Sequence, residues 1–266
     1  MAGRSPLINV VTKACYKVSR RLLRDFGEVE QLQVSKKGPA DFVSTADTNA
    51  ERALVSELKS ARPEYGFLLE EGNEIESRDP DGRRWIIDPL DGTLNFLHGI
   101  PHFCISIALE ERGQVIAGVI YEPIRDEMYW AEKGDGAYLN DRRIRVSGRS
   151  QMNEAVFATG IPFMGRDGHE LFLKQLESVM GSCAGVRRQG AAALDLAYVA
   201  SGRYEGFWEK GVHPWDIAAG MLLVTEAGGM VSDYNGQNRM MEKGEVVAVN
   251  NRLHTPFQRM LRRATK

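Results

Sequence analysis

Hydrophobic positions recur at helical spacing near the start of the chain. Residues 7–26 carry an apolar side chain every three or four positions, and this pattern predicts an amphipathic helix. A second helix is expected over residues 47–61, where Thr48 and Glu51 have the spacing of a capping box. Residues 33–44 between the two helices are mostly polar and are expected to form a mobile loop.

The middle of the chain changes to short apolar runs that are bounded by charged or turn-forming residues. Runs of this kind predict strands, and closely spaced runs predict antiparallel pairing. The expected strands cover residues 66–69, 85–87, 103–111, 114–122, 127–131 and 136–139.

Helical and strand patterns alternate in the last part of the chain, and this alternation predicts a mixed sheet that is covered by helices. The expected strands are residues 155–159, 185–188, 204–208 and 246–249, and the expected helices are residues 168–180, 191–201 and 215–227. We therefore expect an α+β or α/β protein with an N-terminal part, residues 1–148, and a C-terminal part, residues 149–266. The two parts are expected to form one compact catalytic unit.

Composition narrows the functional classes. The 266 residues are 43% hydrophobic and 26% charged, with a formal net charge of −2, which gives no general attraction to nucleic acid or to anionic membranes. The three cysteines are widely spaced, so we expect reduced thiols and a cytoplasmic protein. No apolar run approaches the roughly 20 residues that cross a bilayer.

The most informative stretch is residues 84–96. A buried strand is expected to deliver Asp88, and a β-turn over residues 88–91 would bring Asp91 and the Leu90 carbonyl close to it. Such an oxygen cluster suits a hard divalent cation, Mg²⁺ above all. Gly92 and Thr93 would begin a helix whose free N–H groups face an anion. The alternative is an ordinary surface turn, and this stretch taken alone does not favour one interpretation over the other.

Four further acids follow a strand or begin a helix, which is where αβ proteins build their sites. They are Asp47, Glu70, Glu209 and Asp216. Each also has a simpler interpretation, as a solvated acid or a helix cap. The histidines show no metal-ligand pairing, and no Ser-His-Asp, Cys-His or phosphate-binding Gly-Lys-Ser/Thr motif is present. Chemistry is therefore expected to rest on metal ions bound by oxygen ligands.

Together these motifs resemble the inositol monophosphatase family. The resemblance rests on Glu70-Glu71, Trp85-Ile-Ile-Asp-Pro-Leu-Asp-Gly-Thr-Leu-Asn-Phe96 and Trp215-Asp-Ile-Ala-Ala-Gly220, and it extends to about residue 252. It implies a layered α-β-α-β-α sandwich of the sugar-phosphatase type, usually as a homodimer. It also implies hydrolysis of a small phosphomonoester that depends on two or three Mg²⁺ ions and is inhibited by lithium.

The resemblance also implies roles for individual residues. The metal ligands would be Glu70, Asp88, the Leu90 carbonyl, Asp91 and Asp216. Thr93, backed by Asp47, would orient the attacking water, and Glu70 would take part in catalysis through a third metal. The substrate would contact Asp91, Gly92, Thr93, Arg187, Ala192, Glu209 and Asp216. Leu94 and Ala191 depart from the residues found in many relatives, and Ala191 bears on the choice of alcohol.

The expected activity is hydrolysis of myo-inositol 1-phosphate. Related substrates remain open, namely fructose 1,6-bisphosphate, 3′-phosphoadenosine 5′-phosphate and histidinol phosphate, because specificity depends on a few residues on the alcohol side. A different class of function also remains open, a regulatory protein that contacts the transcription machinery.

Overall fold

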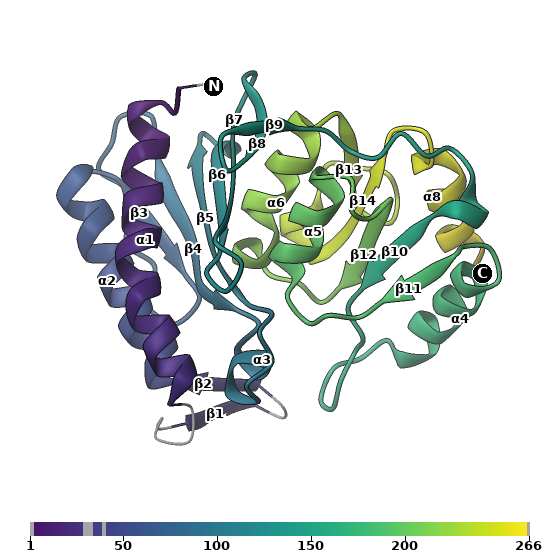
Figure 1. Ribbon diagram of the computed structural model, residues 1–266, viewed down its shortest axis with the longest axis horizontal. Helices are drawn as coiled ribbons and strands as arrows, with labels where there is room; N and C mark the ends of the chain where they lie inside the picture. The colour runs from purple at the N-terminus through teal and green to yellow at the C-terminus, as the bar shows by residue number, and fades with distance from the viewer. Residues whose placement is uncertain (1–2, 29–33, 39–40, 265–266) are drawn as a thin grey trace.

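The computed structural model describes residues 3–28, 34–38 and 41–264. The described chain forms five layers, with helices outside and between two sheets (Figure 1). The layered α-β-α-β-α architecture predicted from the resemblance is therefore confirmed.

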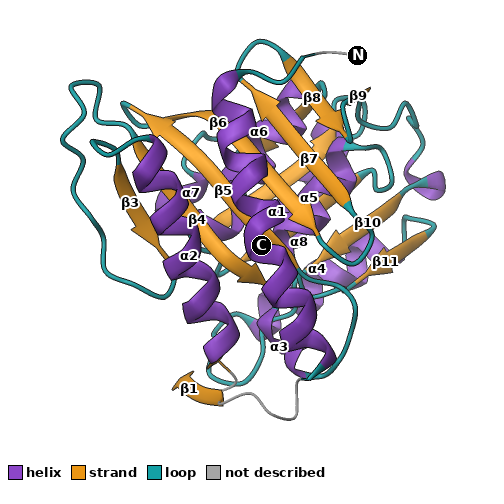
Figure 2. Ribbon diagram, turned by 60° about the vertical axis from the view of Figure 1, so that its left-hand side comes forward, coloured by secondary structure: helices purple, strands orange, loops and turns teal. Residues whose placement is uncertain are grey.

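The first layer contains helices α1 (Pro6–Gly27) and α2 (Thr45–Ala61), which lie against one face of the larger sheet (Figures 1 and 2). In α1 the buried residues Ile8, Val11, Cys15, Val18 and Leu22 recur every three or four positions. That spacing puts them on one helix face, whose burial holds the helix to the sheet.

The larger sheet has seven strands in the order β3-β4-β5-β6-β7-β8-β9. Only β3 and β4 are parallel, and the remaining neighbours are antiparallel. The strands are β3 (Gly66–Leu69), β4 (Arg84–Asp91), β5 (Cys104–Glu111), β6 (Gln114–Glu122), β7 (Glu127–Glu132), β8 (Gly136–Leu139) and β9 (Arg142–Ile144).

The smaller sheet has five strands in the order β11-β10-β12-β14-β13, with parallel pairing around β10 and antiparallel pairing around β14. Its strands are β10 (Val156–Thr159), β11 (Gly185–Arg187), β12 (Gly206–Lys210), β13 (Gly229–Ser232) and β14 (Glu245–Asn250). The two sheets thus separate between residues 144 and 156, and the part boundary expected at residue 148 lies in that segment.

Helices α5 (Ala192–Ala200) and α6 (Pro214–Glu226) fill the layer between the sheets. Almost every residue of α5 is buried, and α6 is buried from Ile217 to Val224, because each helix contacts protein on most of its circumference. Helices α4 (His169–Met180) and α8 (His254–Ala264) cover the outer face of the smaller sheet. Three buried hydrophobic clusters lie between the successive layers.

Four local expectations were wrong. Within residues 33–44, the described residues form the antiparallel strands β1 (Val34–Gly38) and β2 (Asp41–Ser44) rather than a loop. The capping box of α2 is formed by Ser44 and Asp47, not by Thr48 and Glu51. Strand β12 begins later than expected, so Glu209 lies within it. Finally, no turn interrupts β4 at Asp88, because the strand continues through Asp91 with a bulge.

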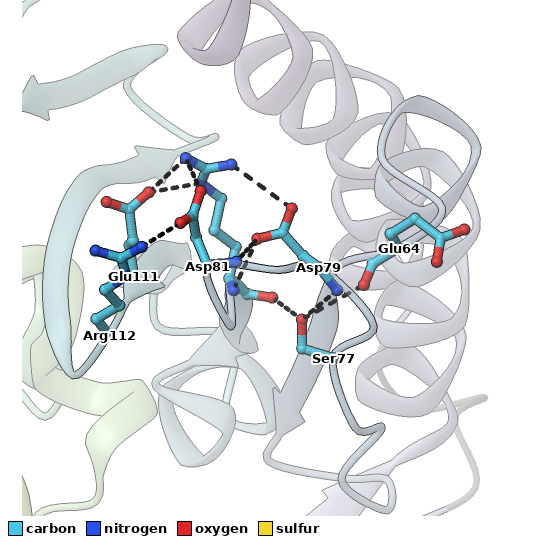
Figure 3. Close-up of polar contacts among 7 residues, drawn as sticks. Glu64, Ser77, Asp79, Asp81, Glu111 and Arg112 are labelled. Carbon is cyan, nitrogen blue, oxygen red and sulfur yellow. Dashed lines mark hydrogen bonds and ion pairs between the residues drawn. The ribbon is translucent and has the colours of Figure 1, made fainter.

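The loop before β4 is fixed by polar contacts (Figure 3). The Asp79 carboxylate accepts hydrogen bonds from the N–H groups of Asp81 and Arg83, and the Arg83 guanidinium contacts Asp79, Asp81 and Glu111. These contacts fix the segment that leads directly into β4. Two further short α-helices are α3 (Thr93–Leu97) and α7 (Met240–Lys243), and Met152–Glu154 form a 3-10 helix. None of the helices in the described ranges is both long enough and apolar enough to span a membrane.

Candidate active site

Strand pairing brings the first two acids together. The parallel strands β3 and β4 are in register, with Leu69 opposite Ile87, so Glu70 and Asp88 follow at neighbouring positions. The negative charge of Glu70 is one of the neighbouring charges that raise the pKa of the buried Asp88. Glu70 is half-buried, whereas Asp88 is almost completely buried.

A bulge in β4 brings Asp91 to the same corner. Asp88 lies opposite Ser106 and Asp91 lies opposite Cys104, so the Asp88–Asp91 segment has one more residue than the paired segment of β5. Pro89 is favoured in such a bulge because it has no N–H to donate to the neighbouring strand. The Leu90 N–H instead donates to Asp88 Oδ1 at 2.9 Å. The bulge therefore brings two carboxylates together within one strand.

The C-terminal part holds Asp91 in place. The N–H of Ala193, in the first turn of α5, donates to Asp91 Oδ2 at 2.7 Å. The first N–H groups of a helix have no partner inside it and stabilise a nearby negative charge. The Asp91 carboxylate is thus fixed by the start of a helix that lies 102 positions away in the sequence.

Asp216 reaches this corner through β5. Ser106, the partner of Asp88 in the ladder, donates its hydroxyl hydrogen to the Trp215 carbonyl at 3.2 Å. Asp216 is the next residue and lies in the first turn of α6, where its Oδ2 accepts a hydrogen bond from the His213 N–H at 2.7 Å. Its charge acts on Asp88. The acids Glu70, Asp88, Asp91 and Asp216, which we call the carboxylate corner, therefore lie together.

Asp88 and Asp91 in the corner are buried and are repelled by neighbouring acids, which raises their pKa values. Burial, followed by the charges of Glu70, Asp91 and Asp216, raises the pKa of Asp88 well above its usual value. Burial also raises the pKa of Asp91 to about 7, with Glu70 and Glu209 adding to the rise and the Ala193 N–H opposing it. Carboxylates in such surroundings ionise together only when a positive charge compensates them.

The donor set fits a hard divalent cation. It consists of four carboxylates and the Leu90 carbonyl, and Mg²⁺ prefers oxygen ligands of this kind. Among the described residues, no three His, Cys, Asp or Glu side chains are already arranged to hold a metal ion. The chemistry of the donors and their uncompensated charge support the fit.

Thr93 and Asp47 form a hydrogen-bonded pair beside this corner. The Thr93 hydroxyl lies 2.8 Å from Asp47 Oδ1 and 3.1 Å from the Leu90 carbonyl oxygen, so its one hydrogen has two acceptors. The other oxygen of Asp47 accepts hydrogen bonds from the N–H and the hydroxyl of Ser44. Asp47 thus serves both as the helix cap that the simpler interpretation predicts and as a partner of Thr93.

Gly92 allows the chain to turn from β4 into α3. Its φ is +95°, in the left-handed region that favours glycine. A Cβ at this position would also lie 3.0 Å from the His102 carbonyl oxygen. A side chain here would therefore displace Thr93 from Asp47 or push the segment that follows α3 outward.

A cleft of about 340 Å³ adjoins the carboxylate corner. Its wall contains Asp91 and Asp216 from the corner, and Ala192, Glu209 and Asp195 from the C-terminal part. A larger cavity, of about 540 Å³, lies near the C-terminal end of α6 and has none of these residues in its wall. Burial and the charge of Asp216 raise the pKa of Glu209 to about 8.

The structure does not bring Arg187 into this cleft. The Arg187 side chain is exposed and donates to the Val186 carbonyl, and the neighbouring Arg188 lines the cleft instead. The expected substrate contact of Arg187 remains a prediction. Ala192 and Glu209 do line the cleft, and their contacts with substrate also remain predictions.

Several residues near the site were not found from the sequence. The Asn95 side-chain amide donates to the carbonyls of His102 and Gln189, which joins α3 to the segment before α5. Gly160 lies against Glu209 so closely that a Cβ there would overlap its carboxylate. Asp195 was also missed. Each depends on contacts across the fold, although Asn95 lies inside the stretch that carried the resemblance.

Comparison with known proteins identifies the family to which this chain belongs. An inositol-1-monophosphatase of Mesorhizobium japonicum is 56% identical over 264 residues, 99% of this chain and 97% of that protein. The crystal structure of the extragenic suppressor protein suhB from Bartonella henselae has a TM-score of 0.94 and 52% identity over 97% of this chain and 98% of that one. A protein of Pseudomonas aeruginosa named Nus factor SuhB is 44% identical over 92% of each chain. Residues 4–265 match the sequence pattern of the inositol monophosphatase family, and the chain belongs to that family.

Proposed function

We propose that this protein is a Mg²⁺-dependent phosphatase that hydrolyses myo-inositol 1-phosphate to inositol and phosphate. The observation that carries the proposal is the carboxylate corner, which opens onto a cleft and has the Thr93–Asp47 pair beside it. A relative that is 56% identical is named an inositol-1-monophosphatase, which supports the choice of substrate.

The residues divide the work as follows. Glu70, Asp88, the Leu90 carbonyl, Asp91 and Asp216 hold two or three Mg²⁺ ions. Bound Mg²⁺ acidifies water and neutralises phosphoryl oxygens, which lowers the barrier to an otherwise very slow hydrolysis.

Thr93 gives its hydroxyl hydrogen to Asp47, so its lone pairs accept a hydrogen bond from the attacking water and orient it. The backbone N–H groups of Gly92 and Thr93, at the start of α3, donate to the phosphate. Glu209 and the backbone near Ala192 contact the inositol hydroxyls across the cleft.

The test of the reaction is a phosphate-release screen over a panel of phosphomonoesters, with and without Mg²⁺. We expect inositol 1-phosphate to be the best substrate and release to require Mg²⁺. Asp88→Asn should abolish turnover while the far-ultraviolet circular dichroism stays unchanged, because Asp88 faces three other acids of the corner. Glu57→Gln, at an exposed ion pair on α2, is the matched control and should keep full activity. Near-normal turnover by folded Asp88→Asn protein would contradict the metal assignment.

Glu209 tests the alcohol side of the proposal. Glu209→Gln should lower kcat/KM for inositol 1-phosphate by roughly one to two orders of magnitude, the scale of a lost charged hydrogen bond. Hydrolysis of phenyl phosphate should change little, because its alcohol has no hydroxyls to contact Glu209. Equal losses on both substrates, or a shifted Mg²⁺ requirement, would place Glu209 among the metal or structural residues instead.

A second function is favoured by the relative named Nus factor SuhB, which is 44% identical. We infer that this chain also acts as a regulatory protein that contacts the transcription machinery. Pull-down of RNA polymerase from lysate by the wild-type protein and by Asp88→Asn separates binding from catalysis. Capture by both proteins supports the second function, and capture by neither removes it.

The proposed assembly is a homodimer, which sedimentation of the purified protein would test. A monomeric sedimentation coefficient at micromolar concentration would remove this part of the proposal.

A further inference from the structure

Asp195 is a buried acid with no structural partner to explain it. It lies in the first turn of α5, is 1% exposed, and forms part of the cleft wall. Its Oδ1 has no hydrogen-bond partner among the described residues. Buried carboxylate oxygens in folded proteins almost always have one, because the loss of hydration is costly. Asp195 is therefore an exception that lies at a candidate binding site.

The charges around Asp195 make this exception more marked. Glu209 and Asp91 both act on it as like charges, and the exposed Arg188 is the opposing cation. Asp233 shows how the same fold treats a structural acid, since its buried carboxylate accepts hydrogen bonds from two backbone N–H groups and from Lys243. Asp195 has no comparable set of donors in the described chain. A residue kept in such a position costs stability, and proteins tolerate that cost mainly at functional sites.

The position of Asp195 in the cleft wall suggests that a bound ligand donates the missing hydrogen bond. Asp195 from α5 and Glu209 from β12 contribute to the same wall, and Ala192 lies one helical turn before Asp195. Carboxylates are strong acceptors and carry no donor when ionised. In their ionised forms both accept hydrogen bonds, and two neighbouring hydroxyls of a polyol supply the two hydrogens.

We propose that Asp195 is a specificity-determining residue that accepts a hydrogen bond from a hydroxyl of the leaving alcohol, beside the one bound by Glu209. The cleft then selects phosphate esters of polyols with neighbouring hydroxyls over esters that lack them. This inference rests on the proposed phosphatase function and adds a second reader of the alcohol.

Asp195→Asn tests the role, because it keeps the shape of the side chain and removes its charge. We expect kcat/KM for inositol 1-phosphate to fall about tenfold, mainly through KM, since the contact also forms in the ground state. Phenyl phosphate should be hydrolysed within twofold of the wild-type rate. The Tm of the ligand-free variant should be equal to or above that of the wild type, because a repelling charge is gone. Asp195→Ala should show a larger loss on the polyol ester alone.

Asp233→Asn is the matched control, because Asp233 is also a buried aspartate but neither it nor its hydrogen-bond partners line the cleft. It should lower Tm and leave the ratio of the two substrates unchanged.

A lowered Tm of Asp195→Asn with equal losses on both substrates would overturn the inference and make Asp195 structural. An unchanged substrate ratio in both Asp195 variants would also overturn it. Failure of the wild-type protein to release phosphate from either ester with Mg²⁺ is a separate result, which would reject the proposed function and this role with it.

Discussion

Asp47 shows how much depends on the two oxygens of a single carboxylate. One oxygen caps α2 through Ser44, and the other binds the Thr93 hydroxyl. The sequence predicted that a helix begins in this region, but not which residues form its capping box. Several residue pairs in this stretch have the required spacing, and the contact with Thr93, 46 positions away, is not visible in the local pattern.

Thr93→Ala should lower kcat about 100-fold, the scale of a misplaced reacting group, with a smaller effect on KM. The reason is that water loses its orienting acceptor whereas the backbone contacts to phosphate remain. Steady-state kinetics with inositol 1-phosphate measure the split, and Thr93→Ser should restore most of kcat. Thr48→Ala, which removes a partly buried hydroxyl that donates to the Thr45 carbonyl in the same helix, is the control. A rise in KM alone would show that Thr93 only binds phosphate in the ground state.

At the scale of elements, the long helices and the central strands could be predicted because their own residues set the period. Short elements were predicted only where turn-forming or charged residues bound an apolar run, as at β3 and β8. Strands β9 and β13 and helix α7, with three or four residues each, lack such a run and were missed. The bulge in β4 was predicted as a turn because Asp-Pro-x-Asp-Gly favours both, and only the pairing with β5 decides between them.

The loop before β4 tests how a segment without regular structure is stabilised. Asp79→Ala should lower the free energy of unfolding by about 1–2 kcal/mol, because two backbone N–H groups lose their acceptor. Asp81→Ala removes only partly exposed ion pairs with Arg83 and Arg112 and should cost less than about 1 kcal/mol. Urea denaturation of both variants measures the difference, and kcat should not change. Equal costs would show that ion pairs rather than backbone contacts hold the loop (Figure 3).

At the scale of the whole molecule, the alternation of helices and strands predicted the fold class, whereas the five layers came from the resemblance. In the structure, burial accounts for the layer that each helix occupies, since the nearly all-apolar α5 and α6 lie between the sheets and the amphipathic α1 and α8 lie outside. The acids were singled out because the sequence pattern put them after strands or at helix starts, whereas in the structure Asp88, Asp91 and Glu209 lie inside strands. Asp195 was missed because a single acid in an apolar helix has no period that marks it.

Stability should depend on pH through Asp233, which directly follows strand β13. Burial alone would raise the pKa of Asp233, but Lys243 and the N–H groups of Gln237 and Asn235 outweigh it and lower that pKa below its usual value. The contribution of Asp233 is therefore complete above the unfolded-state pKa of about 3.9 and is lost as pH falls through the lower folded-state pKa.

Asp233→Asn should cost about 1–3 kcal/mol at pH 7, and the difference from wild type should shrink below about pH 4. Chemical denaturation of both proteins at a series of pH values measures it. A difference that stays constant down to pH 3 would contradict the contribution of the ionised carboxylate.

The hydrogen bond from the Ala193 N–H to Asp91 also has a consequence for how quickly a refolding chain becomes an enzyme. That bond spans 102 positions, and the Ser106–Trp215 bond spans 109, whereas hairpins such as β5–β6 close over a few residues. Contacts between distant positions form late because closing a long loop costs chain entropy. We therefore expect circular dichroism to recover before catalysis does after dilution from denaturant. The recovery time of phosphate release then measures how long the C-terminal part takes to pack against the N-terminal part.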